Sequence, residues 1–241
     1  MDIYSNEYLV VSSIIFLAAL THSITGFGFS IVAMSFLPRI VGLHTSVPLV
    51  TLVTIVGNSI IWYYYRRGSS FKAVGRLTIA SLIATPIGIY FLDLIPETIA
   101  LKGLGILIVS YVLYDWFDLT LPKLKSQIWA YLFGGISGIL NGAYTINGPP
   151  LIVYANCRHW TPEEFKGNLT ALFFFSSVLA AIAHGWQGNI TISVWKFAIY
   201  SLPAFSVGLW LGIIFSNKLN PIIFRRITLA LLLIAGARLL I

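Results

Sequence analysis

Two helix-breaking clusters interrupt otherwise apolar stretches of this chain, and they lie one internal repeat apart. The first is Gly26-Phe27-Gly28-Phe29 and the second is Asn147-Gly148-Pro149-Pro150. Sliding the chain along itself by 120 residues superposes Gly28 on Gly148. Interruptions at corresponding positions of two halves mark the substrate site in many membrane carriers. The pairing therefore constrains both the fold and the search for function.

The same offset relates residues outside the two clusters. It pairs Gly68 with Gly188, Ser81 with Ser201, Ala84 with Ala204 and Gly88 with Gly208, and it has grown to 125 by Pro96 and Pro221. Self-similarity at a nearly fixed spacing is typical of duplicated folds. We therefore expect two membrane repeats, residues 1–120 and 121–241, within a single integral membrane domain.

The apolar composition decides the class of protein. Of the 241 residues 58% are hydrophobic and 10% are charged, with a mean hydropathy of +0.88, which is too apolar for a soluble protein of this size. Most of the apolar segments are about long enough to cross a bilayer as a helix. They lie near residues 8–38, 43–65, 71–92, 97–116, 126–157, 163–184, 191–215 and 220–241. We predict an all-α polytopic membrane protein.

The two segments that carry the breaks, 8–38 and 126–157, are the longest. Each is either one tilted crossing followed by a half-helix, or two half-helices that enter and leave on the same side. Basic residues collect on the cytoplasmic side of a membrane. With the loop around Arg66 in the cytoplasm, a re-entrant 126–157 puts 11 of the 15 basic residues inside, against 8 for a single crossing. Only Arg39, Lys102, Lys196 and Arg238 then lie outside.

This choice inverts the second half relative to the first. We therefore predict two inverted repeats, each with one broken, re-entrant helix pair plus three spanning helices, which makes six full spans. By symmetry, segment 8–38 is expected to be re-entrant as well. The first ten residues contain no Lys or Arg, so charge does not assign the N-terminus to a side. The same lack of a basic N-terminal region argues against a cleavable signal peptide.

A helix that begins inside the bilayer leaves backbone N–H groups unpaired and directs its partial positive end at an anion. Glycine lets the chain turn there, and proline suits the first turn of the next helix. Irregular backbone at such depth is tolerated around a cavity or inside protein. The alternative is that Gly and Pro only serve close helix packing. The predicted substrate-binding residues at the breaks are Ser23, Thr25, Gly26, Phe27, Gly28, Phe29, Ser30, Tyr144, Thr145, Asn147, Gly148 and Pro149.

Further polar residues could reach the same cavity. Asn58 and Asn168 are uncharged candidates, and each could equally be a packing hydrogen bond. All eight acidic residues lie at predicted segment ends, so no carboxylate is expected at the midplane. His22 and His184 are the titratable candidates for coupling, although a histidine in a membrane also bonds to neighbouring helices. Export of a monoanion from a negative interior gains about 2.3 kcal/mol per 100 mV, so the membrane potential could drive it.

Several classes of function find no support in the sequence. Cys157 is the single cysteine, and the four histidines are scattered without helical i, i+4 partners, so no metal and no cofactor are expected. No nucleic-acid-binding motif is present, and clusters such as Arg66-Arg67 are expected to contact lipid head groups of the bilayer. Small-residue faces would allow a homodimer without requiring one.

Three strings, taken in order, resemble the TauE/SafE sulfite exporter family of bacterial permeases. They are Thr25-Gly26-Phe27-Gly28-Phe29-Ser30, Asn147-Gly148-Pro149-Pro150-Leu151-Ile152-Val153-Tyr154 and Phe165-Lys166-Gly167-Asn168. The resemblance covers almost the whole chain. It implies a multi-pass protein of the bacterial inner membrane that exports a small sulfur-containing anion, sulfite or an organosulfonate such as sulfoacetate. Many relatives have Arg where this chain has Lys166, which can attract the anion as a point charge or extend to the membrane interface.

Two other functions remain open at this point. A channel or receptor would bind the same anion without alternating access, although inverted halves favour a carrier, and an uptake permease would carry a sulfur compound inward. Gly135-Ile136-Ser137-Gly138 matches the GxSG string of rhomboid intramembrane serine proteases, with His184 as the partner of Ser137. Against an enzyme, the small residues at 134, 135, 137 and 138 are typical of a helix-packing face.

Overall fold

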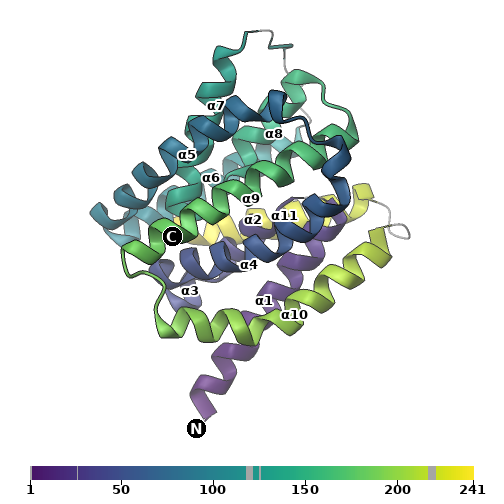
Figure 1. Ribbon diagram of the computed structural model, residues 1–241. Helices are drawn as coiled ribbons and strands as arrows, with labels where there is room; N and C mark the ends of the chain where they lie inside the picture. The colour runs from purple at the N-terminus through teal and green to yellow at the C-terminus, as the bar shows by residue number, and fades with distance from the viewer. Residues whose placement is uncertain (1, 26, 118–121, 125, 217–220) are drawn as a thin grey trace. The chain divides into compact units, whose positions relative to one another are not determined.

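The computed structural model describes residues 2–25, 27–117, 122–124, 126–216 and 221–241, and all of their regular structure is helical (Figure 1). The predicted all-α class is therefore confirmed. The helices are α1 (Asp2–Thr25), α2 (Phe29–Phe36), α3 (Pro38–Val41), α4 (Leu43–Tyr65), the 3-10 turn η1 (Arg66–Gly68), α5 (Phe71–Leu94), α6 (Glu97–Trp116), α7 (Ile128–Tyr144), α8 (Gly148–Arg158), α9 (Pro162–Trp186), α10 (Ile192–Ser216) and α11 (Pro221–Leu240).

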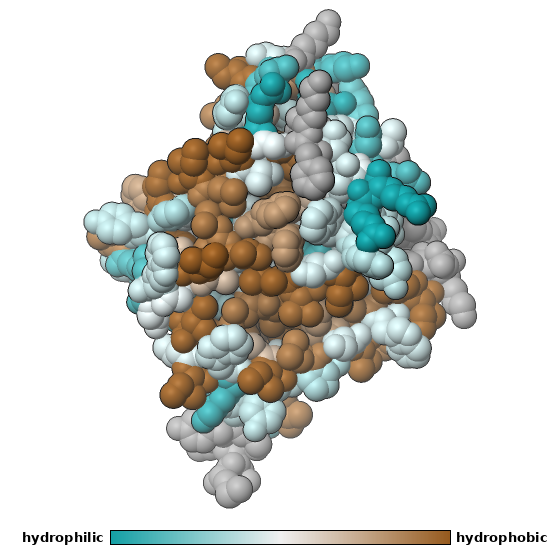
Figure 2. Space-filling view, viewed as in Figure 1, coloured by the Kyte–Doolittle hydropathy of each residue, from teal (hydrophilic) through white to brown (hydrophobic). Residues whose placement is uncertain are grey.

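Within the described residues, six helices are long and apolar enough to cross a membrane: α1, α4, α5, α6, α9 and α10. Five of them, α4, α5, α6, α9 and α10, are spans that the sequence predicted. The sixth is α1, which was expected to form part of a re-entrant segment, and the predicted span α11 is not among the six. Ile79, Ile83 and Ile87 of α5 are 55%, 69% and 46% exposed, and apolar side chains follow this helix in brown in Figure 2. A face of this kind is stable in contact with lipid rather than water.

The chain forms two compact units, and each unit takes helices from both halves of the sequence. Unit 1 comprises Met1–Val53, Pro96–Leu119 and Gly188–Ile241, and unit 2 comprises Thr54–Ile95 and Thr120–Gln187. Helix α4 begins in unit 1 and ends in unit 2. The compact units are therefore not the chain halves 1–120 and 121–241, whose status as repeats stays a prediction.

In unit 1, α1 and α10 pack in parallel through glycines. A Cβ on Gly208 would lie 2.6 Å from the carbonyl oxygen of Phe16, and one on Gly212 would lie 2.9 Å from that of Leu20. Both residue numbers rise together, so the two helices run in the same direction. Backbones approach this closely in membrane proteins where small residues line the crossing.

Helices α6 and α11, also in unit 1, run antiparallel. A Cβ on Gly105 would meet Gly236 and Leu240, whereas one on Gly236 would meet Ile108. Residue numbers at the contacts rise along α6 while they fall along α11, so the two helices point in opposite directions. These two helices are the last of each predicted repeat, so a pair of corresponding helices points in opposite directions.

Unit 2 contains the counterpart of the α1–α10 crossing. Gly134, Gly138 and Gly142 press the backbone of α7 against α5, where added Cβ atoms would lie 2.1–2.5 Å from the carbonyl oxygens of Leu77, Ser81 and Thr85. Helices α5 and α7 are therefore parallel. The predicted packing face is confirmed at Gly134 and Gly138, while Gly135 has no atom within 4 Å of an added Cβ.

Helices α4 and α9 run antiparallel in unit 2. The Oγ1 of Thr54 lies 3.3 Å from the Oγ of Ser177, and a Cβ on Gly167 would lie 2.7 Å from the carbonyl oxygen of Tyr65. The start of α9 thus lies beside the end of α4. These helices again occupy corresponding positions in the two predicted repeats.

The broken segment around 126–157 forms a hairpin whose ends meet. The backbone N–H of Leu124 donates to the carbonyl of Cys157 at 3.2 Å, and Nη1 of Arg158 donates to the carbonyl of Leu124 at 2.8 Å. Helix α8 has 11 residues and is about 16 Å long, too short to cross a hydrocarbon layer of about 30 Å. In the segment around 8–38, α1 alone has 24 residues and is about 36 Å long, and the short α2 and α3 follow it.

Candidate functional site

The first break lies between α1 and α2 and depends on Gly28. This residue has φ +95 and precedes the first turn of α2, a conformation that side chains with a Cβ rarely adopt. The hydroxyl of Thr25 lies 2.5 Å from the carbonyl oxygen of Phe27 and accepts the N–H of Phe27 at 3.3 Å. Thr25 therefore stabilises the turn itself. Gly26, predicted to contribute, lies outside the described residues.

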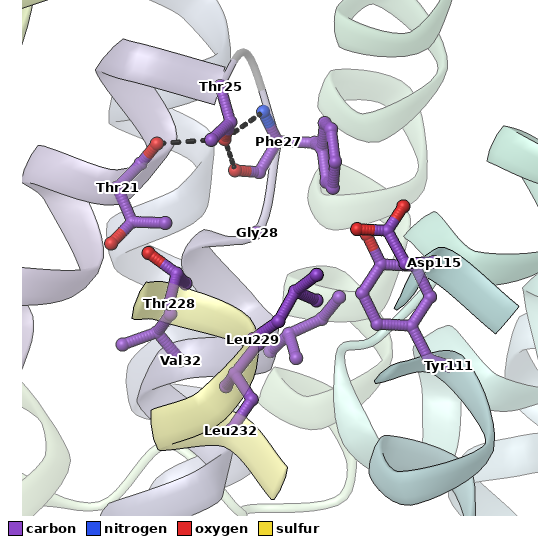
Figure 3. A pocket seen from close by; sticks show the side chains of 11 residues that line it. Thr21, Thr25, Phe27, Gly28, Val32, Tyr111, Asp115, Thr228, Leu229 and Leu232 are labelled. Carbon is purple, nitrogen blue, oxygen red and sulfur yellow. Dashed lines mark hydrogen bonds between the residues drawn. The ribbon is translucent and has the colours of Figure 1, made fainter. Parts of the chain in front are cut away.

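A small pocket, partly open to its surroundings, adjoins this break within unit 1. Phe27 and Gly28 line it from the break, Tyr111 and Asp115 from α6, and Leu229 from α11 (Figure 3). Asp115 lies in the last turn of α6, as the sequence predicts, yet it is only 8% exposed. It is the one charged side chain among the described residues that line the pocket. A carboxylate in the lining repels an anion that approaches it.

The other candidates near the first break pack the interior of unit 1. The hydroxyl of Ser23 donates to the carbonyl of Leu209 at 2.8 Å and so ties α1 to α10. Phe29 is 2% exposed and meets the ring of Phe205 edge-on at 5.6 Å. His22 is also buried and meets Phe29 edge-on at 6.3 Å. Ser30 is half-buried.

The second break, in unit 2, is buried from Tyr144 to Gly148, whereas Pro149 and Pro150 are half-buried. Helix α7 ends at Tyr144, and Thr145 follows with φ 55. The carbonyl of Asn147 accepts a hydrogen bond from the hydroxyl of Ser137 at 3.0 Å, which holds the break against α7. Helix α8 then starts at Gly148 with Pro149 in its first turn, where a missing N–H costs least.

Asn141 belongs to the surroundings of the second break, and it is not among the residues predicted from the sequence. Its side-chain Nδ2 donates to the carbonyl of Ser176 at 3.2 Å, and the hydroxyl of Ser176 lies 3.2 Å from that of Ser81. All three residues are completely buried and uncharged. One signal was available, since Asn141 is a polar residue one helical turn before the break and one turn after Ser137.

The hydrogen bonds of Lys166 and Asn168, two further polar candidates of unit 2, go to residues outside the break. Nζ of Lys166 lies 3.3 Å from the hydroxyl of Tyr65 and 4.9 Å from the centre of its ring. Oδ1 of Asn168 accepts the N–H of Ser70 at 2.7 Å and so caps the start of α5. Phe173, which a Cβ on Gly148 would approach to 4.0 Å, lies about 10 Å further along α9 than Lys166. Asn58 and His184 are buried.

The geometry contradicts a serine protease. The hydroxyl of Ser137 is completely buried and donates to a backbone carbonyl, that of Asn147, instead of to a histidine. A catalytic serine needs a base within hydrogen-bond reach. Among the residues that the structure describes, no group of three or more His, Cys, Asp or Glu side chains is arranged to hold a metal ion.

Comparison with known proteins identifies the family of the chain. The sequence profile described as "Sulfite exporter TauE/SafE" matches residues 11–239. The chain belongs to the TauE/SafE sulfite exporter family. It is therefore a multi-pass membrane transporter of this family and not an enzyme, so the rhomboid interpretation is wrong.

A curated TauE/SafE relative extends the comparison. The chain is 24% identical over 226 residues to the "Probable sulfite/organosulfonate exporter TauE" of Cupriavidus necator, covering 91% of this chain and 88% of the relative. No solved structure matches the chain. The family assignment covers both breaks, so each of them belongs to the shared transporter domain.

Proposed function

We propose that this TauE/SafE protein exports a small sulfur-containing anion, sulfite or an organosulfonate such as sulfoacetate, across the bacterial inner membrane by alternating access. The substrate class follows the name of the Cupriavidus necator relative. Buried polar groups and helix ends beside a chain break support a binding site within the membrane domain. The membrane potential would drive efflux of a monoanion, at about 2.3 kcal/mol per 100 mV.

The observation that supports alternating access is that helices at corresponding positions of the two predicted repeats run in opposite directions. The pairs α4–α9 and α6–α11 each occupy the same place in the two predicted repeats, and each pair is antiparallel. Inverted repeats of this kind let one half of a carrier take the conformation of the other, which opens the site to opposite sides in turn. This supports the inverted relation of residues 1–120 and 121–241.

We assign the anion to the second break in preference to the first. The buried carboxylate of Asp115 adjoins the first break, whereas the side chains around the second, Ser81, Asn141 and Ser176, are neutral hydrogen-bonding groups. The start of α8 also directs the partial positive charge of a helix N-terminus toward this break. An anion is therefore more stable at the second break.

Reconstituted protein tests the proposal. Proteoliposomes loaded with radiolabelled sulfite should release it in a saturable manner, faster with a negative interior, and external sulfite should accelerate the release by exchange. Non-saturable flux without exchange would instead indicate a channel. A binding screen by thermal stabilisation should show about 2.7 kcal/mol for a ligand at 100 times its dissociation constant. Sulfate, thiosulfate, taurine and a carboxylate serve as controls.

A homodimer remains a separate prediction, which a measurement of the molecular mass of the purified protein would test.

A further inference from the structure

Asn141 carries a buried hydrogen-bond acceptor with no partner. The residue is 0% exposed, and Nδ2 is used by the carbonyl of Ser176, but Oδ1 has no hydrogen-bond partner. Exchanging the two ends of the amide would not help, because an oxygen would then face the Ser176 carbonyl. Buried polar atoms are nearly always satisfied in native proteins, so an orphaned one needs an explanation.

This acceptor lies beside the second break. Asn141 and Ser137 are four residues apart on α7 and share a face of the helix. Ser137 uses that position to hold the carbonyl of Asn147, directly before α8. The backbone carbonyl of Asn141 accepts the N–H of Thr145, the residue directly after α7. The carboxamide is therefore positioned between the break and α9.

An acceptor oxygen at an anion site selects among anions. A fully ionised sulfonate presents only oxygen acceptors, which repel the carboxamide oxygen. An anion that also carries a proton can donate it to Oδ1 while its oxygens accept from hydroxyl and backbone N–H groups. Because the surrounding side chains are neutral, a monoanion is also less costly to bury than a dianion.

We infer that Asn141 is a substrate-binding residue whose Oδ1 accepts a hydrogen bond from the protonated form of sulfite, the hydrogensulfite monoanion. The inference rests on the proposed function and names its substrate more narrowly. A buried site built to bond a donor strongly rejects an analogue that lacks it, since the acceptor is then left unpaired. Methanesulfonate is such an analogue, a monoanion of similar size with a methyl group in place of the hydroxyl.

The test is a binding comparison on the purified full-length chain at mildly acidic pH, where hydrogensulfite predominates. The wild type should bind hydrogensulfite at least about tenfold more tightly than methanesulfonate. Asn141→Leu, of similar shape, should reduce that ratio to about one by weakening hydrogensulfite, with methanesulfonate changed less than about twofold. Asn141→Ala, which adds no atom to the packed helix, should do the same if the leucine variant does not insert.

Ser201→Ala is the matched control, because it removes a buried hydroxyl in α10 that bonds its own helix at the carbonyl of Ala198. Both affinities should be unchanged in it. An Asn141 variant that keeps the wild-type ratio, or that weakens both anions equally, would overturn the inference, as would equal affinities in the wild type. A wild type that binds no sulfur oxyanion at all would overturn the proposed function instead.

Discussion

Gly88 and Ile139 are in backbone contact, since a Cβ on Gly88 would lie 2.1 Å from the carbonyl oxygen of Ile139. The positions 120 residues away are Gly208 and Ala19, and a Cβ on Gly208 would lie 3.0 Å from the Cβ of Ala19. One helix crossing is thus built twice, once in each compact unit. In each case a helix of one chain half packs against a helix of the other, so neither half provides a complete unit.

Gly88→Ala should destabilise the protein by about 1–3 kcal/mol, because its Cβ would overlap a backbone carbonyl that cannot rotate away. Thermal unfolding in detergent measures the loss. Gly135→Ala is the control, with no atom within 4 Å of its added Cβ, and should unfold like the wild type. Equal melting temperatures for the two variants would contradict the close crossing of α5 and α7.

Gly28→Ala should cost about 1–2 kcal/mol, because an L-residue is strained at φ +95. Gly148→Ala should cost little, since the nearest atoms to its Cβ would be Ile152 at 3.8 Å and Phe173 at 4.0 Å. The two breaks therefore tolerate alanine differently although they correspond in the repeat. The melting temperatures of the two variants measure the difference. A larger loss of stability for Gly148→Ala than for Gly28→Ala would contradict the strained backbone at Gly28.

Single cysteines at Lys123 and His159, in a chain whose Cys157 is replaced by alanine, should react with an impermeant reagent from the same side of the membrane. The reason is that Leu124 bonds to both Cys157 and Arg158, which closes the α7–α8 hairpin. A cysteine at Arg67 should report that side too, as the cytoplasmic one. Labelling of positions 123 and 159 from opposite sides would favour a single crossing.

Lys166→Ala should change anion affinity by less than about twofold, because the ammonium group interacts with Tyr65 at an exposed position where charge effects are small. Equilibrium binding of the substrate measures the effect. Lys166→Arg, which keeps the charge, is the control. A tenfold loss in the alanine variant that the arginine variant restores would return Lys166 to the anion site.

The helical membrane class, the two breaks and the family were all readable from the chain alone. Hydropathy and the positions of Gly and Pro are properties of local sequence, and local sequence decides whether a segment is apolar and where its helix stops. The duplication near 120 residues was also visible, because it is a relation between residue types. These features needed no knowledge of which helices touch.

Only the tertiary structure decided which polar groups remain for a ligand. Ser23 and Asn168 were candidates by residue type, but hydrogen bonds to Leu209 and Ser70 occupy them. Asp115 was predicted only to lie at a segment end and Asn141 was not a candidate, yet Asp115 is a buried carboxyl group and Asn141 has a buried unpaired acceptor. Burial and hydrogen-bond partners come from helices far apart in the chain, so they are fixed by packing and not by the order of residues along any one segment.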